Sequence, residues 1–206
     1  VKARLLESGE WTAMRVRPFN TVADPATAPA GVFVTAMDSR PHAVNPEWVI
    51  AEQPESFVVG QEALAALVDC PVHVCIAAGS QAPIAASATS NQVQATEFSG
   101  PHPAGLAGTH VHFLQGASLT QLAWTIDYQD VIAIGNLFLK GEVDTARVVS
   151  VSGPAASNPE IIRTARGADM EAITAGNQVA GENRLISGSV LGGRGVQAHS
   201  AYLGRF

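Results

Sequence analysis

Glycines and histidines gather in one segment of this chain, FSGPHPAGLAGTHVHFL at 98–114. The segment holds three glycines, two prolines and three of the chain's six histidines. Glycine-rich turns that lead into a helix bind phosphate through backbone N–H groups, and imidazole is a common zinc ligand. Glycine and proline also build tight turns with no ligand. The segment is therefore a candidate phosphate site, metal site or structural turn.

The phosphate interpretation fails at the residues that a nucleotide triphosphatase needs. Gly100 and Gly105 have the spacing of a P-loop, in which Lys and then Ser or Thr follow the second glycine. Leu106 and Ala107 occupy those two positions. Because no lysine reaches the β- and γ-phosphates, we expect no triphosphatase activity.

A dinucleotide fingerprint has partial support. It requires G-x-G-x-x-G after a strand. Gly105 and Gly108 supply the last two glycines, while Pro103 replaces the first. A stand-alone flavin- or nucleotide-binding oxidoreductase that uses the loop 100–108 remains an alternative function.

The metal interpretation depends on whether His110 and His112 lie on a strand or a helix. The apolar spacing favours a helix over 105–114, on which two residues two apart diverge by about 200°. Glu97 and Asp127 are further candidate ligands, but their spacing does not single them out. A zinc-dependent enzyme remains a second alternative, and it would use His102, His110 and His112.

A hydrolase has less support, because the chain has no G-x-S-x-G elbow. We expect Ser80 and the serines at 187–189 to be structural. Cys70 and Cys75 are the only cysteines, and we expect free, half-buried thiols rather than a disulfide. We place His73 on its own face of the strand, away from Cys75, which leaves that thiol without a catalytic base.

Composition limits the classes of partner. The net charge is −6 and the basic residues are scattered, so the chain lacks the basic face of a nucleic-acid-binding protein. The best apolar run, 131–139, is about half the length that a membrane span needs. Asp127 and Asp130 are expected at the start of a helix rather than at a sodium site.

Strands and helices alternate in the first part of the chain, which favours a parallel sheet. Residues 38–48 are expected to form a polar loop. The expected strands span residues 32–37, 72–78, 93–98 and 122–128; the expected helices span 2–8, 56–69 and 105–114, with a helix or mixed segment at 129–142.

The pattern changes from Thr145 onward. Residues 147–169 indicate a strand, a turn and a strand, 170–176 a short helix, and 184–196 a hairpin-like pair. This order is typical of a β-grasp module. Both ends of the chain begin or stop abruptly, so we expect a piece of a longer protein.

Several separated blocks resemble the A subunit of the Na+-translocating NADH:quinone reductase (Na+-NQR), a bacterial respiratory pump. The main block is 98–114 followed by DYQDVIAIGNLF at 127–138. The other blocks are EWTAMRVRPFN at 10–20, FVTAMDSRP at 33–41, RVVSVSGP at 147–154, RTARGA at 163–168, ISGSVL at 186–191 and YLGRF at 202–206.

The resemblance implies an α/β (α+β) fold. It consists of a Rossmann-like α/β domain at 1–143, related to the flavin-binding subunit of complex I, and a β-grasp (SLBB-type) domain at 144–206. It implies a peripheral protein on the cytoplasmic side of the bacterial inner membrane, which docks chiefly on the membrane-embedded B subunit. The resemblance further implies that the N- and C-terminal domains of the full-length protein are absent from this chain.

The same resemblance implies that the chain itself binds no cofactor and no metal and has no catalytic residue. FAD, the 2Fe–2S centre, FMN and riboflavin belong to other subunits of the complex. A contact with ubiquinone is implied, and its candidate residues are His110, His112, Phe113 and Tyr128. The glycine-rich loop is then the shell of a former nucleotide site, reused as scaffold.

Overall fold

The computed structural model describes residues 1–85, 92–196 and 201–205 and divides the chain into two units. Unit 1 comprises Val1–Ser39 and Asn45–Asp144, and unit 2 comprises Arg40–Val44 and Thr145–Phe206. Each unit is described by itself.

Unit 1 is built on a six-stranded sheet with the order β2-β1-β6-β3-β4-β5. Strands β3, β4, β5 and β6 are mutually parallel where they pair, and β1 runs antiparallel to β6 and β2. The strands span Arg15–Arg17 (β1), Thr21–Val22 (β2), Gly31–Ala36 (β3), Val72–Ala77 (β4), Val93–Phe98 (β5) and Ala123–Asp127 (β6). All six residues of β3 are buried, as expected for a central strand covered on both faces.

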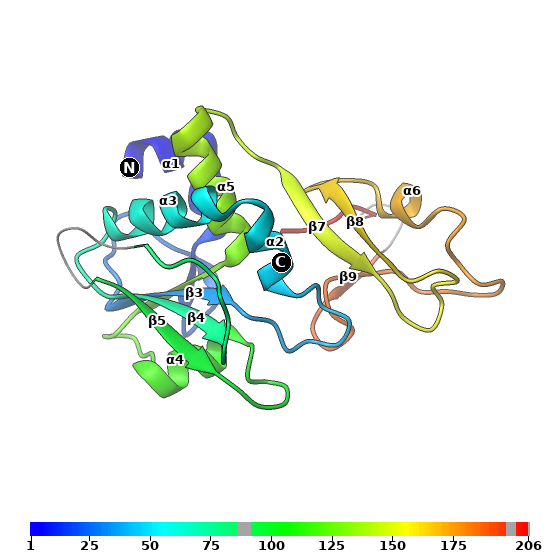
Figure 1. Ribbon diagram of the computed structural model, residues 1–206, viewed down its shortest axis with the longest axis horizontal. Coiled ribbons are helices and arrows are strands. Elements are labelled where there is room, and N and C mark those ends of the chain that lie inside the picture. The colour runs from blue at the N-terminus through cyan, green and yellow to red at the C-terminus, as the bar shows by residue number, and fades with distance from the viewer. Residues whose placement is uncertain (86–91, 197–200, 206) are drawn as a thin grey trace. The chain divides into compact units, whose positions relative to one another are not determined.

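Helices cover both faces of this sheet (Figure 1). Helices α2, α3 and α5 lie on one face, and α4 lies on the other. The helices span Lys2–Ser8 (α1), Pro46–Glu52 (α2), Pro54–Ala65 (α3), Ala107–Leu114 (α4) and Tyr128–Lys140 (α5), with a 3-10 helix at Glu10–Ala13. The crossovers through α2, α3 and α4 are what allow neighbouring strands to run parallel.

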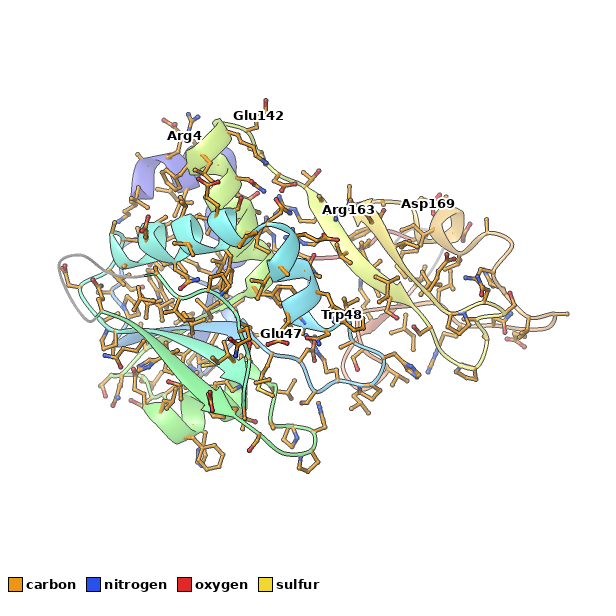
Figure 2. All side chains as sticks on the ribbon, viewed as in Figure 1. Arg4, Glu47, Trp48, Glu142, Arg163 and Asp169 are labelled. Carbon is orange, nitrogen blue, oxygen red and sulfur yellow. The ribbon has the colours of Figure 1, made fainter. Side chains whose placement is uncertain are left out.

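Local sequence explains where α5 begins and ends. The Asp127 carboxylate accepts a hydrogen bond from the Gln129 backbone N–H at 2.9 Å, so it caps the helix. Gly141, at φ +76°, ends it in the left-handed conformation. Arg4 of α1 donates to the Gly141 carbonyl at 3.4 Å, and Figure 2 shows Arg4 close to Glu142 at this end of the helix.

Two glycines bring α3 and α5 into backbone contact. A Cβ atom at Gly60 would lie 2.1 Å from the Val131 carbonyl oxygen, and one at Gly135 would lie 1.8 Å from the Ser56 carbonyl oxygen. Buried polar groups join the same helices, because the Ser56 hydroxyl donates to Asn136 Oδ1 at 2.8 Å. The helix pair therefore tolerates no side chain at either glycine.

In its described residues, unit 2 contains two small antiparallel sheets and one short helix. Strands β7 (Ala146–Val151) and β8 (Glu160–Ala165) form a hairpin, and β9 (Ile186–Ser187) pairs with β10 (Arg194–Gly195). Helix α6 (Met170–Thr174) is capped by Asp169, labelled in Figure 2, which accepts from the Glu171 N–H at 2.9 Å.

The structure differs from the sequence analysis at 38–48 and at 15–22. The segment 38–48 is not entirely loop, because α2 begins at Pro46 with Asn45 accepting from the Glu47 N–H at 3.0 Å. Proline ends helices but is favoured in their first turn, so this proline starts a helix. The short strands β1 and β2 at 15–22 were not predicted either, since strands of two or three residues carry no periodicity.

Candidate functional site

The glycine-rich loop lies at the carboxyl edge of the parallel strands, between β5 and α4. Open α/β sheets bind their ligands at this edge. The loop is fastened to the end of β3 through Ser39: the Gly105 backbone N–H donates to Ser39 Oγ at 2.8 Å. His102 joins the same contact, with its Nδ1 3.1 Å from both the hydroxyl and the carbonyl oxygen of Ser39.

This contact requires glycine at position 105. A Cβ atom there would lie 2.4 Å from the Ser39 backbone nitrogen and 2.8 Å from the Asp38 carbonyl carbon. Both are backbone atoms that a small rotation cannot move aside. Gly105 is therefore explained by close packing of two loops, without a ligand.

The backbone donors of the loop are used inside the protein. The Ala104 N–H donates to the Pro101 carbonyl at 2.9 Å, and the Leu106 N–H donates to the Pro103 carbonyl at 2.9 Å. With the Gly105 N–H bound to Ser39, three successive amides have protein acceptors. A phosphate cradle needs such amides to point at the ligand, so these three do not form one.

Ser39 and His102 resemble a nucleophile and base, but the hydrogen bonds argue against that role. The Ser39 carbonyl can only accept, so the tautomer with a proton on His102 Nδ1 is the one that makes a hydrogen bond to both Ser39 oxygens. A general base needs a lone pair directed at the hydroxyl. The pair is therefore a loop anchor, and it joins residues 63 positions apart in the chain.

His110 is fully buried under the loop. Its Nε2 donates to the Ala104 carbonyl at 2.9 Å, and its ring lies 4.4 Å from the Phe98 ring, centroid to centroid. Among the described residues its Nδ1 has no hydrogen-bond partner. Burial lowers the pKa of this imidazole, and the bond to Ala104 opposes that shift. The neutral ring anchors α4 to the loop.

His112 and Phe113 lie on the outward side of α4. Both are exposed, Phe113 by 72%, and their rings meet edge to face with centroids 5.3 Å apart. The two histidines of the helix therefore differ: one is in the core and the other faces outward. Their side chains point in different directions from α4, as expected for two residues two positions apart on a helix.

Tyr128 is the first residue of α5 and is 5% exposed. Its hydroxyl accepts a hydrogen bond from Gln129 Nε2 at 3.2 Å. Helix α5 lies on the opposite face of the sheet from α4 (Figure 1). The four quinone candidates therefore do not gather in one slot: His112 and Phe113 are adjacent and accessible, and His110 and Tyr128 are buried apart from them.

The metal candidates are likewise dispersed. In the part of the chain that the structure describes, no group of three or more His, Cys, Asp or Glu side chains is placed to hold a metal ion. Asp127 caps α5, and Asp130 lies in the first turn of that helix. Both aspartates are therefore groups at the start of a helix, as predicted.

The expectation that His73 lies on a different face from Cys75 is wrong. Residues two apart on a strand share a face; His73 stacks on Phe33 at 5.0 Å, and Phe33 and Cys75 belong to one buried cluster. Both cysteines are free. Burial raises the pKa of Cys75 to about 12, and burial with the nearby Asp69 carboxylate raises that of Cys70 to about 11. Neither thiol is a nucleophile near neutral pH.

Sequence reasoning did not find Ser39, the residue that organises the loop. The signal available for it was position, since Ser39 follows the first buried strand at the edge where loops converge. Its hydrogen-bond partners, His102 and Gly105, lie far away in the sequence. Which residues meet Ser39 is therefore known only once the order of the strands in the sheet is known.

Two family models match the chain in succession. The model described as NqrA second alpha/beta domain matches residues 1–143, and the NQRA C-terminal domain, of SLBB type, matches residues 148–198. These matches confirm the predicted fold class, an α/β domain followed by an SLBB domain.

Curated proteins match over the whole chain. The A subunit of the Na(+)-translocating NADH-quinone reductase of Serratia proteamaculans is 52% identical over 206 residues, that of Vibrio campbellii 49% and that of Yersinia pseudotuberculosis 48%. The chain covers 45% of each of these relatives, and so spans less than half of their length.

Solved structures share the fold at low sequence identity. Crystal structures of an NAD+-reducing [NiFe]-hydrogenase match with TM-scores of 0.58 in the air-oxidized state and 0.55 in the H2-reduced state. The identities are 13% and 12%; the matches cover 90% and 81% of this chain, and 41% and 35% of the hydrogenase chains. At these identities the likeness concerns the fold alone.

Proposed function

The chain belongs to the family formed by the A subunits of Na(+)-translocating NADH-quinone reductases, and from this we propose that it serves in a Na+-pumping NADH:ubiquinone oxidoreductase complex. The observation that carries the proposal is the ordered match of both family domains along one chain, with 52% identity to a named member over all 206 residues of this chain. Because the chain covers 45% of that relative, the activity belongs to the full-length protein within its complex.

In this proposal the chain is a docking and scaffold part, and electrons pass through FAD, 2Fe–2S, FMN and riboflavin held by other subunits. Two features of its own residues support that role. Three amides of the glycine-rich loop donate to protein acceptors, so the loop does not offer them to a flavin phosphate. Burial raises the pKa of both Cys70 and Cys75, so neither thiol is a ready nucleophile near neutral pH.

We place the protein at the cytoplasmic side of the bacterial inner membrane, docked on the membrane-embedded B subunit. In residues 1–85, 92–196 and 201–205, no helix has both the length and the apolar character of a membrane span. Attachment through a membrane-embedded partner is consistent with that observation.

A quinone contact by this chain would be made first by His112 and Phe113. An aromatic ring and a hydrogen-bonding imidazole side by side suit a quinone head group, and both are exposed. His110 and Tyr128, the other two candidates, are buried, so they would act only after a local opening. Since an exposed helix face is not a pocket by itself, a partner protein would supply the opposite wall.

The test is co-purification of the full-length protein that contains this sequence, expressed with the remaining subunits of its complex. We expect it to purify with them in a fixed ratio, and we expect membranes without it to lose Na+-stimulated quinone reduction by NADH. A protein that purifies alone and yellow, with bound flavin, would overturn the proposal in favour of a stand-alone flavin oxidoreductase.

A further inference from the structure

The turn that joins β9 to β10 in unit 2 carries two adjacent exposed aliphatic side chains. We call residues 188–193 the β9–β10 turn; β9 is labelled in Figure 1. Val190 is 61% exposed and Leu191 is 63% exposed. A single exposed aliphatic side chain is ordinary, whereas two together at the end of a hairpin form a candidate contact surface.

The backbone of the β9–β10 turn is hydrogen-bonded within the turn. The Leu191 N–H donates to the Ser189 hydroxyl oxygen at 3.2 Å. The N–H groups of Gly192 and Gly193 donate to the Ser189 carbonyl at 3.2 and 2.6 Å. Because these three successive amides have acceptors of their own, moving the turn from water into an apolar layer leaves none of the three unpaired.

The sequence around the turn is purely cationic. Residues 183–206 contain three arginines and no Asp or Glu. Arg184 is exposed and precedes β9 by one residue, and Arg194 is the first residue of β10. Each basic residue near an anionic membrane surface adds to the attraction, and this segment has no carboxylate to oppose it.

The third arginine is held beside the same hairpin by the end of the chain. The Gly204 N–H donates to the Ser187 hydroxyl oxygen at 3.1 Å, and Arg205 follows directly. The Arg194 guanidinium donates to the Tyr202 carbonyl at 2.8 Å and lies 4.5 Å from the centroid of that ring. Tyr202 is 49% exposed, and tyrosine is enriched where an apolar layer meets water.

The rest of the chain has the opposite charge pattern. Residues 41–139 contain eight Asp and Glu and no Lys or Arg. An anionic surface repels that segment and attracts residues 183–206. The attraction is therefore concentrated in the segment that also carries the exposed aliphatic turn.

The combination of aliphatic and cationic groups distinguishes between classes of partner. Nucleic acid would engage the arginines, but its phosphates and base edges offer no apolar layer to Val190 and Leu191. The anchors of protein interfaces are enriched in Trp, Tyr and Arg, and Leu and Val are under-represented among them. An anionic bilayer supplies headgroups for the arginines and acyl chains for the aliphatic pair.

We propose that the β9–β10 turn inserts Val190 and Leu191 into the interface of an anionic lipid bilayer, with Arg184, Arg194 and Arg205 at the headgroups. The contact is reversible, because two aliphatic side chains and three charges are a small anchor. It goes beyond the proposed function, since direct contact with lipid needs no other subunit.

The test uses the full-length protein that contains this sequence, purified without the other subunits and sedimented with vesicles. One set of vesicles is phosphatidylcholine with about one third phosphatidylglycerol, and the other is phosphatidylcholine alone. The wild type is expected to bind the anionic vesicles at least about tenfold more strongly than the neutral ones. Added salt is expected to weaken that binding, because it screens the arginines.

Two variants separate the aliphatic and cationic contributions. The double variant Val190→Ser, Leu191→Ser is expected to lower the affinity for anionic vesicles at least about tenfold, and Arg184→Gln about fivefold. Val179→Ser, which removes a 42% exposed side chain of the same unit, and Arg4→Gln, at an exposed arginine of unit 1, are the matched controls. Both controls are expected to bind like wild type.

A spectroscopic measurement shows whether the turn enters the lipid. An environment-sensitive fluorescent amino acid at position 191 is expected to shift to the blue with anionic vesicles and to be quenched by lipids brominated in their acyl chains. The same probe at position 179 is expected to stay unchanged. Circular dichroism checks the fold of each variant; Arg184→Gln and the probe keep the test decisive if the double serine variant does not fold.

The proposal is overturned if the wild type binds neither kind of vesicle, binds both equally or binds duplex DNA more tightly than the anionic vesicles. It is also overturned if the folded double serine variant binds like wild type or if the probe at 191 is not quenched. Co-purification with the other subunits is a separate measurement. A protein that co-purifies but ignores vesicles refutes only this inference, and one that binds vesicles but does not co-purify refutes only the proposed function.

Discussion

The contact between α3 and α5 predicts that Gly135→Ala destabilises unit 1, although alanine is the better helix former. The new Cβ atom would lie 1.8 Å from the Ser56 carbonyl oxygen, whereas non-bonded heavy atoms rest about 3.5 Å apart. The two helices must therefore separate by more than about an ångström. That separation also weakens the hydrogen bond from the Ser56 hydroxyl to Asn136, which is 2.8 Å long.

The expected loss of stability combines two destabilising contributions with one stabilising contribution. Overpacking a well-packed contact costs about 1–3 kcal/mol, and loss of the Ser56–Asn136 hydrogen bond costs about 1 kcal/mol. Replacing a helical glycine by alanine returns about 1 kcal/mol. We therefore expect the free energy of unfolding of unit 1 to fall by about 2 kcal/mol in Gly135→Ala.

The assay is urea unfolding followed by tryptophan fluorescence. All three tryptophans lie in unit 1, and the Trp11 and Trp124 rings meet edge to face at 5.6 Å, so the signal reports this unit. Gly108→Ala is the matched control in a helix with open space at the Cβ position, and it is expected to stabilise by up to about 1 kcal/mol. Equal or greater stability of Gly135→Ala would refute the steric reasoning.

Three other outcomes follow from the loop, the histidines and the thiols. Gly105→Ala is expected to destabilise unit 1 by about 1–3 kcal/mol in the same urea assay, because its Cβ atom would meet backbone at 2.4 Å. Wild-type stability of this variant would contradict the loop contact. Burial lowers the pKa of His73 and His110, so their contribution to stability is complete above pH about 6.5. It is lost on acidification, because the unfolded chain takes up protons that the folded chain resists. A urea midpoint that stays constant between pH 7 and 5.5 would contradict this, as would a His110→Phe variant whose midpoint changes with pH as much as that of the wild type. Cys70 and Cys75, with pKa raised to about 11 and 12, are expected to react with a thiol reagent at pH 8 only after unfolding; rapid labelling of the folded chain would show an accessible thiolate.

The sequence predicted the central elements of unit 1 because their patterns are physically dictated. The run of β-branched and aromatic residues at 32–37 predicts a buried strand, and β3 occupies Gly31–Ala36 with every residue buried. The helix expected at 56–69 is observed as α3 at Pro54–Ala65. It ends at Ala65, four residues sooner than expected.

The contacts at the site were beyond the reach of the sequence. His110 and His112 have the same type and lie two positions apart, yet one is buried and the other exposed. That difference follows from which side of α4 meets the sheet. The role of Ser39 depends on the parallel sheet order and on crossover lengths, which bring the end of β3 beside a loop far along the chain.

The glycine-rich loop shows why glycine spacing alone is a poor guide to a phosphate site. What binds an anion is a set of backbone N–H groups with no acceptor of their own, and glycine only permits the conformation that presents them. Here the amides of Ala104, Gly105 and Leu106 donate to Pro101, Ser39 and Pro103. A glycine motif with its amides already bonded is a packing device. Removing the acceptor is therefore the informative change: Ser39→Ala would free the Gly105 N–H, and it should loosen the loop without creating affinity for phosphate, since the neighbouring amides remain bound.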